Sequence, residues 1–291
     1  PTISFELFPP KTDKGMQNLA GQVEELVACD PAYITCTYGA GGSTRDRTLE
    51  VLRTLRARYP EMPLASHLTC VGSSVQELHA YLARTREAGV NYIVALRGDP
   101  PKGETTFTRP EGGLGFANEL VEMLRADFPE FGIAVGGYPE THVEAESPQA
   151  DIDHLKRKVD AGADIITTQL FYDNDDFYRW RDECVAAGIN VPIVPGVLPV
   201  TNLAQIKRIT SMCGAKLTNQ LVNRLEAQRD EEGQFLVGLY YATRQVEDLV
   251  ANGVPGLHFY VLNKSRAAAF ICQALALSIP APQAPPLPTG V

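Results

Sequence analysis

Short apolar runs alternate with longer amphipathic segments along most of the chain. Eight of these runs are rich in β-branched and aromatic residues and are bounded by Pro or Gly, as strands commonly are. They cover residues 3–8, 32–38, 63–70, 91–98, 132–138, 164–172, 192–198 and 256–263. A segment with helical periodicity follows each run, and two further helices are expected at about 217–228 and 234–252. Strands and helices in this order predict an α/β fold with a parallel sheet.

Two parallel architectures show this alternation, an open doubly wound sheet and a closed barrel. The chain has no GxGxxG after its first strand and no GxxxxGK[ST], which are the nucleotide motifs typical of the open sheet. We therefore predict a (β/α)8 TIM barrel with extra helices before the last strand. Such barrels reach about 250 residues as a single domain. Residues 1–278 are expected to form one catalytic barrel, and the Pro-rich residues 279–291 an extended C-terminal tail.

Composition and charge narrow the class of protein. With 44% hydrophobic and 21% charged residues, the chain has the make-up of a globular protein. Its net charge of -9 disfavours nucleic acid and anionic membranes as partners, so an anionic ligand must meet a local basic cluster. The most apolar helical stretch, residues 267–277, is shorter than the ~20 residues that span a bilayer. We expect neither a membrane segment nor a secretory signal.

Six cysteines are scattered without CxxC spacing, a pattern that argues against a disulfide framework and against a zinc site. His67 and His142 lack the spacing of metal ligands and are interpreted as hydrogen-bonding or stacking groups, whereas His79 and His258 are interpreted as structural. We therefore expect no metal and a cytoplasmic location. Amphipathic outer helices often associate, so a homo-oligomer is expected.

One carboxylate interrupts the first apolar run, ISFELF at residues 3–8. Period-two alternation places Ser4, Glu6 and Phe8 on one strand face. Functional groups of such barrels lie at the C-terminal ends of the strands, so Glu6 is expected in the barrel mouth. Two interpretations stay open. Either Glu6 pairs with a cation such as Arg97, or burial raises its pKa so that it holds a proton near neutral pH, as a general acid must.

The motif RGDPP, at residues 97–101, follows the fourth expected strand. It places Arg97 and Asp99 on either side of a glycine. The two charges form an internal ion pair, or Gly98 permits the close approach of a flat or phosphate-bearing ligand. The loop GAGGSTRDRT, at residues 39–48, offers backbone amides that can bind an anion at the start of a helix, but a flexible loop ending in a helix cap explains it equally well.

A helix with two distinct faces is predicted at residues 147–162, with Ser147 as N-cap and Pro148 as first helical residue. Asp151, His154 and Lys158 share its polar face. That face is solvated, or it binds ligand phosphates. The second interpretation is favoured by the KRK run at 156–158, which is the densest basic run of an acidic chain.

Taken together, the motifs resemble the methylenetetrahydrofolate reductase family in its bacterial single-domain form. The matching segments, in order from about residue 2 to 277, are SFELFPPKT, TYGAGGSTRDRT, HLTC, VALRGDPP, YPETH, ADIDHLKRKVDAGAD, TTQLFYD, PGVLPV and HFYVLNKS. The resemblance implies a flavin- and folate-binding TIM barrel that reduces 5,10-methylenetetrahydrofolate to 5-methyltetrahydrofolate. FAD and a nicotinamide donor, NADH or NADPH, are the implied cofactor and co-substrate, with ping-pong kinetics. Animal members carry a regulatory domain after the barrel, and we expect none here.

The resemblance also assigns roles to individual residues. Glu6 resembles the general acid that opens the substrate ring, and Asp99 the carboxylate that faces pterin and flavin. The residues implied to contact FAD are Thr37, Tyr38, Ala40, His67, Arg97, Gly98, Asp99, Phe116, Ala117, Tyr138, His142, Asp151, His154, Arg157 and Lys158. Those implied to contact the substrates are Glu6, Asp99, Gln169, Gln205 and Lys264.

Three of these positions depart from the family pattern, with Phe116 in place of Tyr, His154 in place of Asn and Lys264 in place of Arg. Lysine cannot reproduce the two-pronged contact of an arginine. Two other functions remain as alternatives: a flavin-free folate-dependent methyltransferase or demethylase on the same barrel, and a protein that only binds folate. Bound flavin separates the reductase from the first, and hydride transfer separates it from the second.

Overall fold

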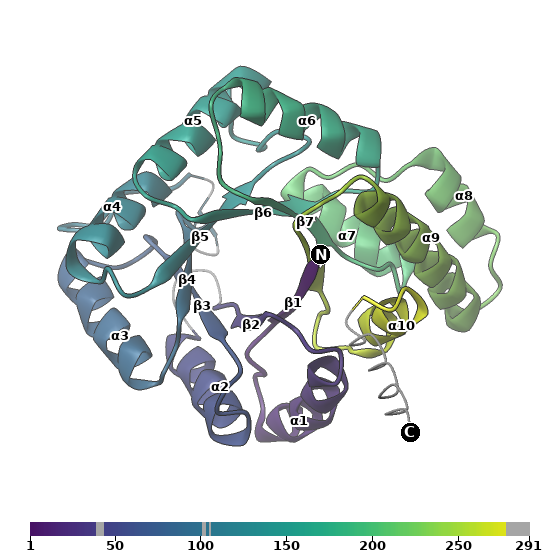
Figure 1. The fold of residues 1–291 in the computed structure, drawn as a ribbon, viewed down its shortest axis with the longest axis horizontal. Helices are drawn as coiled ribbons and strands as arrows, with labels where there is room; N and C mark the ends of the chain where they lie inside the picture. Colours follow the sequence, from purple (N-terminus) through teal and green to yellow (C-terminus); the bar gives the residue numbers. More distant parts are fainter. Residues whose placement is uncertain (39–43, 101–102, 105, 278–291) are drawn as a thin grey trace, which may run out of the picture.

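The structure is a computed structural model that describes residues 1–38, 44–100, 103–104 and 106–277. Within these residues, eight parallel strands close into a barrel in the order of the sequence, as predicted (Figure 1). The strands are β1 (Thr2–Leu7), β2 (Tyr33–Cys36), β3 (Leu64–Thr69), β4 (Tyr92–Leu96), β5 (Gly132–Gly137), β6 (Ile165–Leu170), β7 (Ile193–Val197) and β8 (Gly256–Tyr260). The tail expected at 279–291 lies outside the described residues.

Helices surround the barrel (Figure 1). They are α1 (Asp13–Val27), α2 (Arg45–Arg58), α3 (Val75–Glu87), α4 (Ala117–Asp127), α5 (Pro148–Asp160), α6 (Asn174–Ala186), α7 (Leu203–Cys213), α8 (Asn219–Glu226), α9 (Glu231–Ala251) and α10 (Arg266–Ala274). The extra helices expected before the last strand are therefore α8 and α9. No helix in the described part of the chain combines the length and apolarity needed to cross a membrane.

The alternation predicted for the first strand is present in β1. Ile3, Phe5 and Leu7 are at most 2% exposed and belong to the main apolar core. Ser4 and Glu6 project from the opposite strand face, into the barrel, where their contacts come from β3 and β8. Strand pairing puts Glu6 level with a residue on each neighbouring strand, Thr35 on β2 and Tyr260 on β8.

The cap predicted for the helix after β5 is also present. Ser147 is extended and accepts a hydrogen bond from the backbone N–H of Ala150, and Pro148 opens α5. The proline lacks only an N–H that has no partner in a first helical turn. Ile152 and Leu155 are buried against the core. With this apolar side fixed, the register of the polar side of α5 is also fixed.

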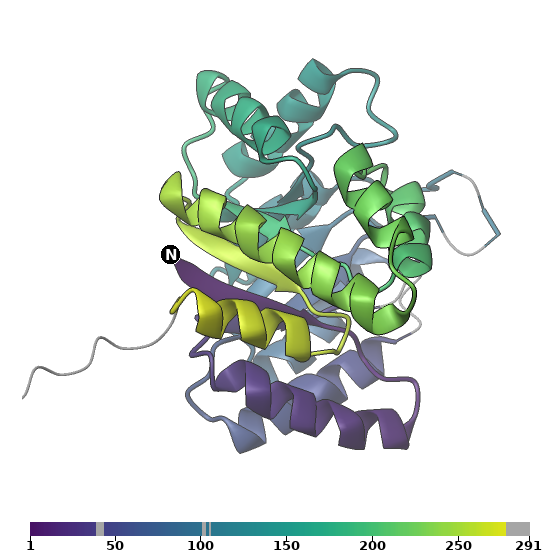
Figure 2. The same cartoon turned by 90° about the vertical axis from the view of Figure 1, so that its right-hand side faces the viewer.

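The extra helices have a second apolar cluster of their own. Ile206 on α7 and Leu221 and Leu225 on α8 are buried in this cluster, which also contains residues that follow β6 and β7. Long helix α9 lies in front of β8 and β1, side by side with α10 (Figure 2). These contacts fix α7 and α9 beside the barrel mouth.

Close packing of α9 predicts an unusual result for a helical glycine. A Cβ atom at Gly238 would lie 1.8 Å from the backbone carbonyl oxygen of Val200, whereas one at Gly21 in α1 would meet nothing within 4 Å. Helix propensity alone favours Ala over Gly by about 1 kcal/mol at either site. We expect Gly21→Ala to raise the thermal midpoint of unfolding and Gly238→Ala to lower it. Equal stabilisation by both substitutions would show that α9 is less tightly packed than described.

Candidate active site

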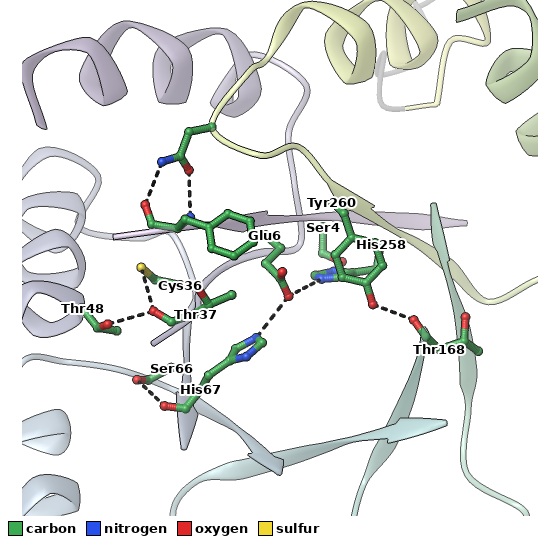
Figure 3. Close-up of polar contacts among 12 residues, drawn as sticks. Ser4, Glu6, Cys36, Thr37, Thr48, Ser66, His67, Thr168, His258 and Tyr260 are labelled. Atoms are coloured by element: carbon green, nitrogen blue, oxygen red, sulfur yellow. Dashed lines mark hydrogen bonds and ion pairs between the residues drawn. The ribbon is translucent and has the colours of Figure 1, made fainter. Parts of the chain in front are cut away.

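Glu6 lies near the C-terminal end of β1, 8% exposed, between two imidazole rings (Figure 3). Its Oε2 atom is 3.2 Å from Nε2 of His67 on β3 and 3.8 Å from Nε2 of His258 on β8. The proposed ion pair with Arg97 is therefore wrong. Arg97 Nη1 instead donates to Glu144 Oε2 at 2.6 Å.

Ser4 and Tyr33 hold the His258 ring in place. Its Nδ1 atom is 2.7 Å from Ser4 Oγ, and its ring stacks on Tyr33 with an interplanar angle of 18°. These contacts agree with the interpretation of His258 as a structural residue, and its Nε2 atom also lies near Glu6. The sequence indicated the position of His258, because period-two alternation in β8 places His258 and Tyr260 on the same strand face. The Tyr260 hydroxyl donates to the carbonyl oxygen of Thr168 at 2.6 Å (Figure 3).

Two opposed effects set the pKa of Glu6. Burial raises it, but the contacts with His258 and His67 lower it more, and the result is a pKa of about 2 instead of 4.5. The expectation that burial dominates is therefore wrong for this arrangement. Glu6 is a carboxylate at neutral pH, and it can serve as an acid only after a proton reaches its Oε2 atom.

A second cluster of polar residues is formed by the polar side of α5 and the segments that it contacts. Asp151 is 8% exposed and accepts a hydrogen bond from the backbone N–H of His142 at 3.0 Å. Lys158 Nζ donates to the carbonyl oxygen of Gly136 at 2.6 Å. Burial lowers the pKa of Lys158 to about 8, although nearby Asp151 opposes this shift. This part of the helix is not a solvated face, whereas His154 and Arg157 on the same helix are exposed.

Aromatic and imidazole rings connect α5 to the end of β5. Tyr138 meets His142 edge to face, with ring centroids 4.6 Å apart, and Lys158 Nζ lies 6.0 Å from the centre of the Tyr138 ring. The backbone N–H of Glu144 donates to His142 Nδ1 at 3.1 Å, so the neutral ring carries its proton on Nε2. Burial lowers the pKa of His142, which favours this neutral form.

The RGD segment at the end of β4 contains no pair between its own charges. Arg97 pairs with Glu144, and Asp99 is exposed. Gly98 has a φ of 89°, and a Cβ there would lie 2.8 Å from side-chain carbons of both Thr69 and Val71. Packing against the end of β3 is thus sufficient to explain this glycine, whether or not a ligand approaches it.

The remaining residues implied to contact the cofactor follow β2 or lie at the start of α4. Tyr38 is buried, and its hydroxyl accepts from the backbone N–H of Thr69 at 2.8 Å. The carbonyl oxygen of Thr37 accepts from Thr48 Oγ1 at 2.8 Å. Phe116 is 60% exposed just before Ala117, the first residue of α4. Ala40 lies outside the described residues.

The residues implied to contact substrate occupy two places. Gln169 is on β6, and its Oε1 atom accepts from the backbone N–H of Leu170 at 2.9 Å. Gln205 and Lys264 line a cavity of about 760 Å³, whose wall also includes Tyr260. Glu6 contacts His67 and is paired in strand register with Tyr260 of the cavity wall, although neither Glu6 nor His67 lines the cavity itself. Arg97 and Lys158 lie elsewhere, Arg97 directly after β4 and Lys158 on α5 against the end of β5.

The pKa of Glu6 predicts how stability depends on pH. A carboxyl with a pKa of about 2 when folded and 4.5 otherwise adds up to about 3 kcal/mol above pH 4.5. That contribution declines as the pH falls from 4.5 towards 2. We therefore expect wild type to unfold at higher urea than Glu6→Gln at pH 7, with a smaller difference at pH 3.5.

Glu226→Gln is the matched control for this measurement. Glu226 pairs with Lys207 on the surface, where both side chains are about half exposed. Its substitution should change stability by less than about 1 kcal/mol. A gap between wild type and Glu6→Gln that widened on acidification would contradict a lowered pKa at Glu6.

Comparison with known proteins identifies the family. Residues 1–276 match the family model described as methylenetetrahydrofolate reductase. The 5,10-methylenetetrahydrofolate reductase of Escherichia coli is 39% identical over 274 residues, which cover 94% of this chain and 90% of that protein. Methylenetetrahydrofolate reductase (NADH) 1 of Arabidopsis thaliana is 40% identical over 286 residues, 94% of this chain. The match spans about half, 48%, of the plant protein.

Solved structures agree on the fold. An uncharacterized protein from Clostridium thermocellum that binds two copies of 5-methyl-5,6,7,8-tetrahydrofolic acid superposes with a TM-score of 0.63 at 14% identity, covering 95% of this chain and 94% of that chain. A phosphonopyruvate hydrolase gives a TM-score of 0.52 at 15% identity, covering 95% and 81%. At such identities the likeness concerns the barrel alone, because one fold carries many functions. The sequence matches identify the family as well as the fold, and the chain belongs to the methylenetetrahydrofolate reductase family.

Proposed function

We propose that this protein reduces 5,10-methylenetetrahydrofolate to 5-methyltetrahydrofolate, with FAD as cofactor and NADH or NADPH as hydride donor. The observation that carries the proposal is the placement of Glu6, a buried carboxylate in the barrel mouth within reach of two imidazoles. A purely structural ion pair needs only one partner. Two imidazoles around one carboxylate oxygen form an arrangement suited to moving a proton.

The residues around α5 fit a flavin nucleotide. Lys158 is a half-buried amine whose hydrogen-bond partner is a backbone carbonyl, and Arg157 and His154 are exposed on the same helix. Together with Arg97 they form a basic group in an acidic protein, as a diphosphate requires. Bound FAD would supply the ability to accept and pass on a hydride. Tyr138 and His142 would contact it with ring faces and edges.

The role proposed for Glu6 is to deliver a proton to a ring nitrogen of the folate. Substrate entry excludes water, and burial is the effect that raises the pKa of Glu6. If a ligand also loosens the contacts with His67 and His258, the carboxylate gains affinity for a proton at Oε2. A proton held on either imidazole is within a short transfer of that atom.

Asp99 and Gln169 would orient the pterin. Asp99 is an exposed carboxylate at the end of β4, and an anion there stabilises a cation that develops in the substrate. The Gln169 amide must give up its hydrogen bond to the Leu170 backbone before both of its ends can reach the pterin. A flavin-free folate methyltransferase would need only the residues that bind folate, and it would leave the half-buried Lys158 without a ligand.

Three further properties remain predictions. The plant relatives are named as NADH enzymes, which favours NADH as donor for this chain. A single flavin that serves donor and folate in turn would give ping-pong kinetics. A cytoplasmic location and a homo-oligomer are also proposed, whereas the acidic pI of about 5.1 disfavours nucleic acid as a partner.

Visible absorption spectroscopy of the purified protein tests the cofactor. We expect flavin bands that bleach when NADH is added without oxygen. Lys158→Met should weaken FAD binding by roughly tenfold or more, because it removes a half-buried cation. Lys156→Met is the control, since Lys156 pairs with Asp160 on the surface of the same helix. Absence of flavin binding under any condition would make the flavin-free folate enzyme the better interpretation.

Half-reactions test the role of Glu6. In Glu6→Gln, the flavin should still bind and still be reduced by NADH, whereas oxidation of the reduced flavin by methylenetetrahydrofolate should slow by roughly a hundredfold or more. Stopped-flow absorbance measures the two steps separately. Near wild-type reduction of the folate by this variant would rule out Glu6 as the proton donor.

A further inference from the structure

A row of polar side chains crosses the barrel interior beneath Glu6. Ser4 precedes Glu6 on the inward face of β1, and it is paired in register with Tyr33 on β2 and with His258 on β8. Ser4 Oγ lies 2.7 Å from His258 Nδ1 (Figure 3). Thr167 on β6 completes this polar row from across the barrel. Bulky apolar side chains usually fill the interior of a TIM barrel, so the polar row is unusual.

The members of the polar row contact one another in sequence. His258 Nε2 is 3.8 Å from Glu6 Oε2, and Nδ1 of the same ring is bonded to Ser4 Oγ. The Tyr33 hydroxyl in turn forms hydrogen bonds with Ser4 and Thr167. Ser4 and His258 are at most 3% exposed, whereas Thr167 is half-buried. The polar row therefore joins a buried carboxylate to a less buried hydroxyl on the other side of the barrel.

Distances indicate the direction of these hydrogen bonds. Ser4 Oγ is closer to His258 Nδ1, at 2.7 Å, than to the carbonyl oxygen of Leu257, at 3.3 Å, so its proton is placed towards the imidazole. Neutral His258 then accepts at Nδ1 and carries its proton on Nε2, the atom that faces Glu6. Ser4 Oγ, whose own proton is used in this way, accepts from the Tyr33 hydroxyl. The hydroxyl and N–H protons are thus all directed towards Glu6 Oε2.

Tyr33 stays protonated in this position. Burial raises its pKa, and the hydrogen bonds with Ser4 and Thr167 only partly oppose this effect. A phenolate is therefore disfavoured, and the hydroxyl can pass on its proton only while it receives another. Thr167, which is half-buried, is the member of the polar row placed to pass on that replacement from water.

The two imidazoles beside Glu6 differ in their surroundings. His67 is nearer, at 3.2 Å, but 12% of its side chain is exposed, against 3% for His258. A ligand in the barrel mouth would cover His67, whereas the polar row behind His258 lies beneath such a ligand. A movement of Glu6 Oε2 by about 1 Å would complete a hydrogen bond with His258 Nε2.

We propose that His258, Ser4 and Tyr33 form a proton relay that supplies Glu6 from inside the barrel. The inference rests on the proposed function, because it concerns the proton that Glu6 delivers to the folate. The Nε2 proton of His258 moves to Glu6 Oε2. The Ser4 hydroxyl proton then replaces it at Nδ1, and the Tyr33 proton moves to Ser4 Oγ. Solvent returns one proton to Tyr33 through Thr167, so only Glu6 changes its charge.

The relay acts while substrate keeps water out of the barrel mouth. Its members touch Glu6 or one another and not the substrate, so they are positioning residues for the Glu6 proton. After the transfer His258 carries its proton on Nδ1. Water that enters when the product leaves restores the Nε2 form, and the relay is ready for another turnover.

NMR of protein labelled with 15N-histidine tests the resting state without any ligand. We expect neutral His258 in wild type to carry its proton on Nε2, with its signals assigned by their loss in His258→Gln. Ser4→Ala removes the hydroxyl that donates to Nδ1. The ratio of the Nε2 form to the Nδ1 form should therefore fall by roughly fivefold, the effect of one hydrogen bond.

Stopped-flow absorbance of flavin oxidation by methylenetetrahydrofolate tests the transfer. Tyr33→Phe keeps the ring that stacks on His258 but lacks the hydroxyl. It should slow this step by roughly tenfold, while flavin reduction by NADH stays within about twofold of wild type. Tyr81→Phe is the matched control, since the Tyr81 hydroxyl lies 3.1 Å from Ser66 Oγ in another part of the core. This control should leave both steps at the wild-type rate.

The remaining outcomes overturn the proposal in distinguishable ways. A wild-type rate of flavin oxidation in Tyr33→Phe, or a His258 proton on Nδ1 in resting wild type, would exclude the relay. Equal slowing of both half-reactions in Tyr33→Phe would show that the hydroxyl only supports the barrel. Failure of flavin-loaded wild type to reduce the folate would overturn the proposed function, whereas the NMR measurement would still decide the resting state of the relay.

Discussion

The contact between one buried carboxylate and two imidazoles is the constraint around which the barrel mouth is built. Glu6, His67 and His258 come from β1, β3 and β8, so their meeting requires the barrel to close with β8 beside β1. An isolated carboxylate at 8% exposure would carry a large desolvation cost. The imidazoles offset this cost and hold the group ionised. Closure of the fold and the charge state of its central residue are therefore linked.

In this arrangement Glu6 is ionised, and it could act as an acid only once its pKa rises and it takes up a proton. Burial and the imidazoles shift the pKa of Glu6 in opposite directions, and the imidazoles dominate in the structure described. Because the pKa of Glu6 results from two opposed effects, burial and the contacts with the imidazoles, it is sensitive to small movements of these groups. A ligand that changed the distance between Glu6 and His67 would therefore change the pKa of Glu6. A lone surface carboxylate, with neither effect, has no comparable means of changing its proton affinity on binding.

Local patterns predicted the fold because each depends on near neighbours in the chain. Eight apolar runs, the Ser147 cap and the inward facing of Glu6 follow from periodicity and cap chemistry, and the structure has them. Partners of charged groups were not predictable in this way. Glu6 and His258 are 252 positions apart, and Arg97 pairs with Glu144 from the loop after β5, a residue that no motif singled out. The direction of the Glu6 pKa depends on these partners, so it was wrongly predicted.

The same distinction applies to the basic residues of α5 and α7. Sequence alone shows a KRK run at 156–158 and a KR pair at 207–208, without indicating which cation turns inward. Packing decides this. The apolar side of α5 fixes Lys158 against Gly136, and burial of Ile206 leaves Arg208 on the cavity while Lys207 reaches Glu226. Neighbouring cations of equal charge thus acquire different surroundings, and the half-buried or cavity-facing member of each set is the one available to an anionic ligand.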